Sequence, residues 1–177
     1  MKKIICLGKN YKDFYHKTKT WIPAYNGTKY KYLESIVEYG LKIPGTKLPN
    51  GLKTQKPIYI PLNDNVSGIK NWESAIFVSP SINYALDPRY SEIIDNISKD
   101  DKYNIIVGVR IRPNSFTKHK SKIIIENFPF HPDIDGNVED IYRISSEKDI
   151  IATSINFIKY KFLGFELSKE VEEFNIN

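Results

Sequence analysis

The sequence has little cysteine, little histidine and no long apolar run. The single cysteine, Cys6, excludes an internal disulfide framework and a zinc site built from cysteines. The three histidines lie far apart along the chain, which favours surface positions, and we expect no metal site. No stretch approaches the ~20 apolar residues that span a membrane, and the apolar run 4–7 is shorter than the ~7–15 residues of a secretory signal. We therefore expect a cytoplasmic protein with no membrane partner.

The composition indicates one folded domain. Hydrophobic residues make up 41% and aromatic residues 13% of 177 residues, which is too much apolar material for a disordered chain. We expect a single domain over 1–177, with a short acidic tail from about 166. The net charge of +5 is compatible with phosphate-bearing ligands or nucleic acid. Because no compact block of lysine and arginine occurs, a solvated surface is the simpler interpretation.

Helical patterns are confined to the first part of the chain. Residues 29–39 predict a helix, with Thr28 as its N-cap and Gly40 as its stop. The proline- and glycine-containing stretch 43–57 predicts a loop. A second helix is expected over 91–97, after the Asp-Pro pair that precedes it.

Strand patterns surround and follow these helices. They occur at 58–62 and 75–79 in the first half, and at 104–112, 122–126, 140–145 and 150–161 in the second. Residues 147–149 suit a hairpin turn. Helices followed by mostly uninterrupted strands indicate the α+β class.

Three segments carry a recognisable pattern. Residues 25–41 give an aromatic, Asn-Gly-Thr and a helix that ends in Gly-Leu, and residues 75–85 give a strand followed by Ser-x-x-Tyr. A third segment reads Ile-Tyr-Arg-Ile over 141–144. In order and spacing these segments resemble the three motifs of poly(ADP-ribose)-polymerase-like ADP-ribosyltransferases. The resemblance covers roughly residues 21–163. It implies a split half-barrel of two mixed, mostly antiparallel sheets with flanking helices, and NAD as the substrate.

The resemblance also implies roles for individual residues. Gly27 is expected to bind the nicotinamide amide through its backbone, where a Cβ atom would leave no room for the ligand. Ser81 would contact the carboxamide and Tyr84 would stack on the nicotinamide ring. Phe77 takes the place of a family tyrosine, and Thr28 follows the binding glycine in the first motif.

Two departures from the family pattern concern catalysis. Asn26 stands where the family has a histidine that holds a ribose hydroxyl, and asparagine offers a donor and an acceptor at similar reach. Ile141 stands where the family has its catalytic glutamate, and an isoleucine cannot accept a hydrogen bond or stabilise a developing cation. Two neighbouring carboxylates are candidates to replace it. Glu139 shares a face with Ile141, whereas Asp140 would need a one-residue bulge.

Three functions remain open from the sequence. The first is NAD-dependent ADP-ribosyl transfer to an unknown protein acceptor, in active or weakened form. The second is a non-catalytic module that binds NAD, ADP-ribose or a protein, and the third is transfer directed to nucleic acid. A purely structural interpretation also stands beside each motif, because residues 25–28 suit an Asn-Gly turn and Tyr84 suits a core position.

Overall fold

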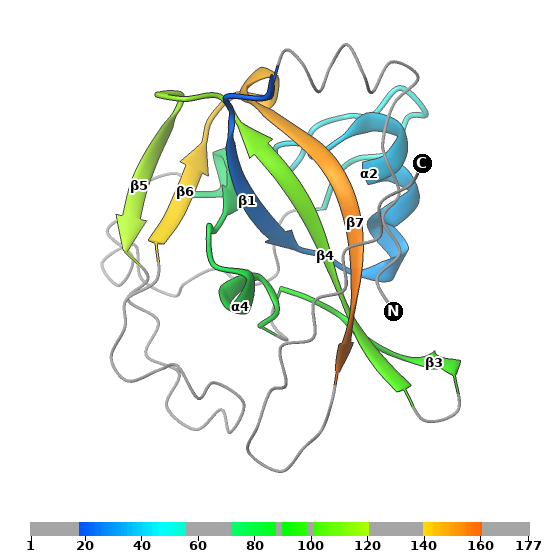
Figure 1. Cartoon of the computed structure of the whole chain (residues 1–177). Coiled ribbons are helices and arrows are strands. Elements are labelled where there is room, and N and C mark those ends of the chain that lie inside the picture. Colours follow the sequence, from blue (N-terminus) through cyan, green and yellow to red (C-terminus); the bar gives the residue numbers. More distant parts are fainter. Residues whose placement is uncertain (1–17, 56–71, 88–89, 99–100, 121–139, 161–177) are drawn as a thin grey trace.

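The computed structural model describes residues 18–55, 72–87, 90–98, 101–120 and 140–160 (Figure 1). In these ranges the chain is an α+β structure with two sheets and few helices. All the strand pairings between described residues are antiparallel.

The larger sheet is organised around one long strand, β4 (Asp101–Ile111). β7 (Ile150–Tyr160) pairs with one edge of β4 along nearly its whole length. The other edge of β4 is shared by β1 (Ile22–Gly27) and β3 (Ile93–Ser98), which pair with its two halves. The β-branched and aromatic residues of β4 and β7 explain why both long strands could be predicted from the sequence.

The smaller sheet has the order β2-β6-β5. Its strands are β2 (Ile76–Val78), β6 (Asp140–Ile144) and β5 (Phe116–Lys120). β2 and β1 also meet through one isolated antiparallel bridge between Tyr25 and Ser79, so the edge strands of the two sheets adjoin each other at this point.

Helical structure is short. Tyr30–Tyr32 forms the 3-10 turn η1, which leads into α2 (Leu33–Tyr39), and Gly40 ends α2 with a φ of 75°. Glycine is suited to this left-handed position because it has no Cβ. α4 (Ile82–Ala85) follows β2 and lies close to β1 (Figure 1). Two further 3-10 turns, η2 (Trp72–Ser74) and η3 (Glu147–Asp149), precede β2 and β7.

The core is shared by both sheets and α2. Its buried members include Ile36 from α2, Val107, Val109 and Ile111 from β4, and Tyr142 and Ile144 from β6. Directly opposite residues of paired strands share a face. Because Val78 pairs with Tyr142 and Ile76 with Ile144, this register places four apolar side chains on the core face of the small sheet.

Three predictions about local structure are wrong. Residues 91–97 do not form a helix, because the Ser91 hydroxyl accepts from the Ile105 N–H at 3.0 Å and donates to the Ile105 carbonyl at 2.9 Å. These bonds hold the segment extended along β4. Thr28 is not a helix cap, because it continues β1 and its N–H donates to the carbonyl of Ile105 at 3.3 Å. Residues 147–149 connect β6 to β7 in a different sheet, so they do not close a hairpin.

Several predictions are confirmed. A helix occupies most of 29–39, residues 76–78 form a strand within 75–79, and β4, β6 and β7 match the expected strands. The described part of the 43–57 loop contains only an isolated bridge, Lys47 to Lys53. The strands expected at 58–62 and 122–126 and the acidic tail from 166 lie outside the described residues. No helix within the described ranges is long and apolar enough to cross a membrane.

Candidate functional site

The first two sequence motifs meet where β1 and β2 adjoin. The Tyr25 N–H donates to the Ser79 carbonyl at 2.8 Å, and the Ser79 N–H donates back to the Tyr25 carbonyl at 2.9 Å. The side-chain amide of Asn26 adds a third bond, to the carbonyl of Phe77 at 2.9 Å. Asn26 therefore ties the two motifs together, a structural role that a histidine or asparagine at this position can fill by donating one N–H.

The directions of the N–H and C=O groups of Gly27 follow from those of its neighbours along the chain. Tyr25 directs its N–H and C=O toward Ser79, whereas Thr28 directs its N–H toward Ile105 of β4. Because these directions alternate along an extended strand, the N–H and C=O of Gly27 point away from β4, toward the β2 side. Neither group is bonded to a described residue. Gly27 thus presents an adjacent donor and acceptor just beyond the point where β1 and β2 part.

The α-carbon of Gly27 is covered by the chain itself. A Cβ atom there would lie 2.4 Å from the carbonyl oxygen of Ala85 and 2.7 Å from the Cβ of Tyr90. Glycine is required here because these two residues approach the strand closely. Contacts within the protein are therefore enough to require glycine at this position. The expectation that the Gly27 backbone binds a ligand amide stays a prediction.

Ser81 and Tyr84 lie at the two ends of the first turn of α4. Ser81 is the N-cap, and its Oγ accepts from the Tyr84 N–H at 3.3 Å. A serine hydroxyl can accept twice and donate once, so capping leaves its hydrogen available to another acceptor. The Tyr84 ring stacks on Tyr90, with ring centroids 5.3 Å apart and their hydroxyl oxygens 3.0 Å apart.

β6, the strand that carries the third motif, joins the same junction through the backbone of its first residue. The Ser79 hydroxyl donates to the carbonyl of Asp140, the first residue of β6, at 2.7 Å, and the Ser81 N–H donates to the Ser79 Oγ at 3.1 Å. One buried hydroxyl therefore connects β2, the start of α4 and β6. All three motifs of the sequence lie together in the fold.

The side chain of Asp140 is engaged elsewhere. Its carboxylate forms an ion pair with Lys120 of β5 at 2.6 Å. The pairing of β6 with β5 is regular from Asp140 to Ile144, so these five residues of β6 contain no bulge. The other candidate carboxylate, Glu139, lies outside the described residues.

Ile141 lies on the face of β6 opposite Tyr142 and Ile144. It is 9% exposed and alternates with Tyr142 and Ile144, which belong to the core cluster. Arg143 shares the face of Ile141, and its guanidinium donates to the hydroxyls of Ser145 at 2.6 Å and Ser74 at 3.3 Å. The side chain at the position that the sequence resemblance assigns to the catalytic glutamate is therefore apolar and buried.

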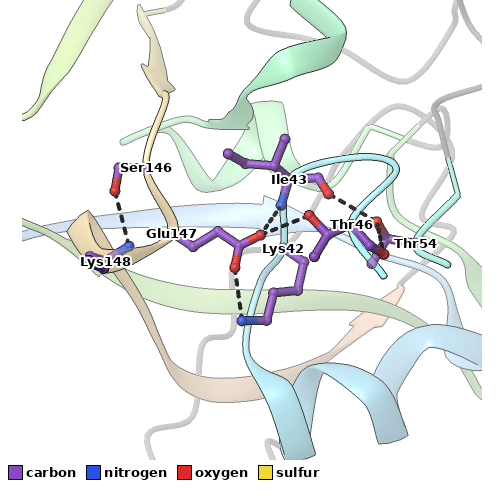
Figure 2. A network of polar contacts seen from close by, with 7 residues as sticks. All are labelled: Lys42, Ile43, Thr46, Thr54, Ser146, Glu147 and Lys148. Atoms are coloured by element: carbon purple, nitrogen blue, oxygen red, sulfur yellow. Dashed lines mark hydrogen bonds and ion pairs between the residues drawn. The ribbon is translucent and has the colours of Figure 1, made fainter. Parts of the chain in front are cut away.

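A separate polar network fixes the loop after α2 (Figure 2). The Glu147 carboxylate of η3 accepts from the Lys42 ammonium at 2.9 Å and from the Ile43 N–H and the Thr46 hydroxyl at 3.0 Å each. Thr54 closes the loop by donating to the Ile43 carbonyl at 2.9 Å. Burial alone raises the pKa of Glu147, but these three donors outweigh it and hold the pKa below its ordinary value.

Two residues that take part in this junction were not identified as site residues from the sequence. Tyr90 contacts both Tyr84 and Gly27, and Ser79 links all three motifs. Ser79 lies within the second motif, so its position was a usable signal. No pattern in the sequence pairs Tyr90 with Tyr84, because the contact depends on the turn that follows α4.

Within the described ranges, no group of three or more histidine, cysteine, aspartate or glutamate residues could hold a metal ion. No protein-family model, no curated protein and no solved structure matches the chain. The resemblance to ADP-ribosyltransferases therefore rests on the sequence motifs of this chain alone.

Proposed function

We propose that this protein is an ADP-ribosyltransferase-like NAD-binding protein that has lost most or all of its transferase activity. On this proposal the two sheets form the split half-barrel of that family, with α2 and α4 as its flanking helices. A protein acceptor is the expected target of any residual activity.

The observation that carries the proposal is the backbone of Gly27. A carboxamide has one N–H₂ donor group and one C=O acceptor, and the adjacent C=O and N–H of Gly27 complement them. The free hydrogen of the Ser81 hydroxyl can donate to the same carboxamide oxygen. Nicotinamide is the part of NAD that carries a carboxamide, and its loss from NAD is the bond cleavage that supplies the ADP-ribosyl group.

Two residues of β6 support the loss of transferase activity. Ile141 offers neither an acceptor for the ribose hydroxyl nor a charge to stabilise the transition state. Asp140, the adjacent carboxylate, is paired with Lys120 and stands in a regular strand. Losing one preorganised electrostatic group lowers the rate about 10²–10³-fold in comparable enzymes, which supports binding without efficient turnover.

Two measurements on the purified chain test this function. The first is the melting temperature with and without NAD, which rises if NAD binds the folded state. The second is chromatographic detection of nicotinamide released from NAD. We expect a NAD-dependent rise in melting temperature and release near the buffer rate. Rapid release would show an active transferase or hydrolase, and the absence of both effects would refute NAD as the ligand.

A further inference from the structure

Tyr90 contacts Gly27 and Tyr84, the two residues that the proposed function places around a nicotinamide ring. Its Cβ abuts the α-carbon of Gly27, at 2.7 Å from the point that a methyl carbon on Gly27 would occupy, and its ring stacks on Tyr84 with an interplanar angle of 28°. Directly packed aromatic pairs have centroids about 4.5–7 Å apart, so the separation of 5.3 Å leaves no space for a third ring between them.

The backbone of Tyr90 is held in place. Its N–H and that of Ser91 both donate to the carbonyl of Asp87, at 2.8 and 2.9 Å, and the Glu92 N–H donates to the carbonyl of Thr28 at 3.0 Å. Ser91 is in turn bonded to β4 through its hydroxyl. Movement of Tyr90 is therefore expected at its side chain, by rotation about χ1, while its Cβ stays against Gly27.

We propose that the Tyr90 ring occupies the ring-binding position beside Tyr84 and that a flat, carboxamide-bearing ligand has to displace it. This inference rests on the proposed NAD-binding function. On this proposal the Tyr90 ring competes with the ligand for the position beside Tyr84. The ligand binds only the fraction of molecules in which the Tyr90 ring has rotated away. The apparent dissociation constant exceeds the intrinsic one by the reciprocal of that fraction.

Two substitutions of Tyr90 separate displacement from structural support. Tyr90→Ala keeps the Cβ that packs on Gly27 and removes the ring from Tyr84. Tyr90→Phe keeps the stacked ring and removes the hydroxyl that lies 3.0 Å from the Tyr84 hydroxyl. A residue with a purely structural role would lower both the melting temperature and the affinity when it is truncated.

The experiment is a calorimetric titration of the full chain with NAD, for the wild type and both variants, beside a thermal melt of each. We expect NAD affinity to rise about tenfold or more for Tyr90→Ala and less for Tyr90→Phe, even where the melting temperature falls. Equal or weaker binding by Tyr90→Ala would overturn the displacement inference while leaving NAD binding in place. Binding by neither the wild type nor Tyr90→Ala would refute both the proposed function and this inference.

Discussion

The Asn26 side-chain amide donates to the Phe77 carbonyl at 2.9 Å and so joins the end of β1 to the middle of β2. The neighbouring pair of backbone bonds between Tyr25 and Ser79 is the only strand pairing between the two sheets among the described residues. The position of Gly27 relative to α4 thus depends on a small number of bonds.

Replacing Asn26 by alanine removes the bond to Phe77 and is expected to lower the free energy of unfolding by about 1–2 kcal/mol. Asn26→Asp provides the matched control, because aspartate has nearly the same shape but no donor and would direct a charge at a carbonyl. It should be at least as destabilising as alanine in urea denaturation. If both variants unfold like the wild type, Asn26 does not support the junction.

Gly27→Ala is expected to destabilise the fold by about 1–3 kcal/mol, because the new methyl group overlaps the Ala85 carbonyl and the Tyr90 Cβ. Gly108→Ala in β4 is a useful comparison. Its Cβ would lie 2.4 Å from the Ser154 Oγ, a side-chain atom that can rotate away, and therefore a smaller loss is expected. Equal losses of stability for the two variants in thermal or chemical denaturation would contradict this prediction. They would show that the backbone near α4 moves aside as easily as the Ser154 hydroxyl.

Glu147 gives a pH-dependent prediction. Its folded-state pKa is lowered, so its contribution to stability is complete above the unfolded pKa of about 4.3 and declines as the pH falls through the folded value. Glu147→Gln should lower the free energy of unfolding by about 1–2 kcal/mol near neutral pH. The difference between wild type and variant should shrink below about pH 4.3. A difference that stays constant from pH 7 to pH 3 would contradict the role of the charge.

Substitutions at Ile141 and at Asp140 of β6 test which position can supply a catalytic carboxylate. Ile141→Glu should raise nicotinamide release by about 10²-fold over the wild type if this is the family's glutamate position, whereas Ile141→Gln, of the same size but uncharged, should not. Because Ile141 is nearly buried, the glutamate variant should also be less stable. An equal rise in both variants, or none with glutamate in a folded protein, would refute the assignment.

Asp140→Asn tests the alternative directly. The ion pair with Lys120 is partly exposed, and exposed pairs contribute only about 0–1 kcal/mol, so the variant should remain folded. Any residual nicotinamide release should be unchanged. A loss of residual release in a folded Asp140→Asn protein would identify Asp140 as the acting carboxylate and remove the case for lost activity.

The parts of the fold that could be predicted depend on local pattern. Gly40 ends α2 because the left-handed backbone there suits glycine, and the apolar, β-branched residues of β4 and β7 form strands. The segment 91–97 could not be predicted in the same way. Its extended form depends on bonds between the Ser91 hydroxyl and Ile105, which are distant in sequence.

The candidate site, like the fold, could be predicted only in part from the sequence. The motif order placed Asn26, Gly27, Ser81 and Tyr84 together, and the structure brings their segments to one junction. The position of the Asp140 carboxylate depends on which residue of β5 lies opposite, and nothing in the sequence of β6 gives that register. Tyr90 could not be found either, because its contact with Tyr84 arises from tertiary packing on Gly27.

The most direct test of NAD binding at this junction is a calorimetric titration of the wild type and of Ser81→Asp with NAD. Aspartate is also a good N-cap, so α4 should be retained while the hydroxyl donor to the carboxamide is lost. We expect saturable one-to-one binding by the wild type and at least tenfold weaker binding by a fully folded Ser81→Asp protein. No saturable binding by the wild type, or undiminished binding by Ser81→Asp, would contradict this expectation.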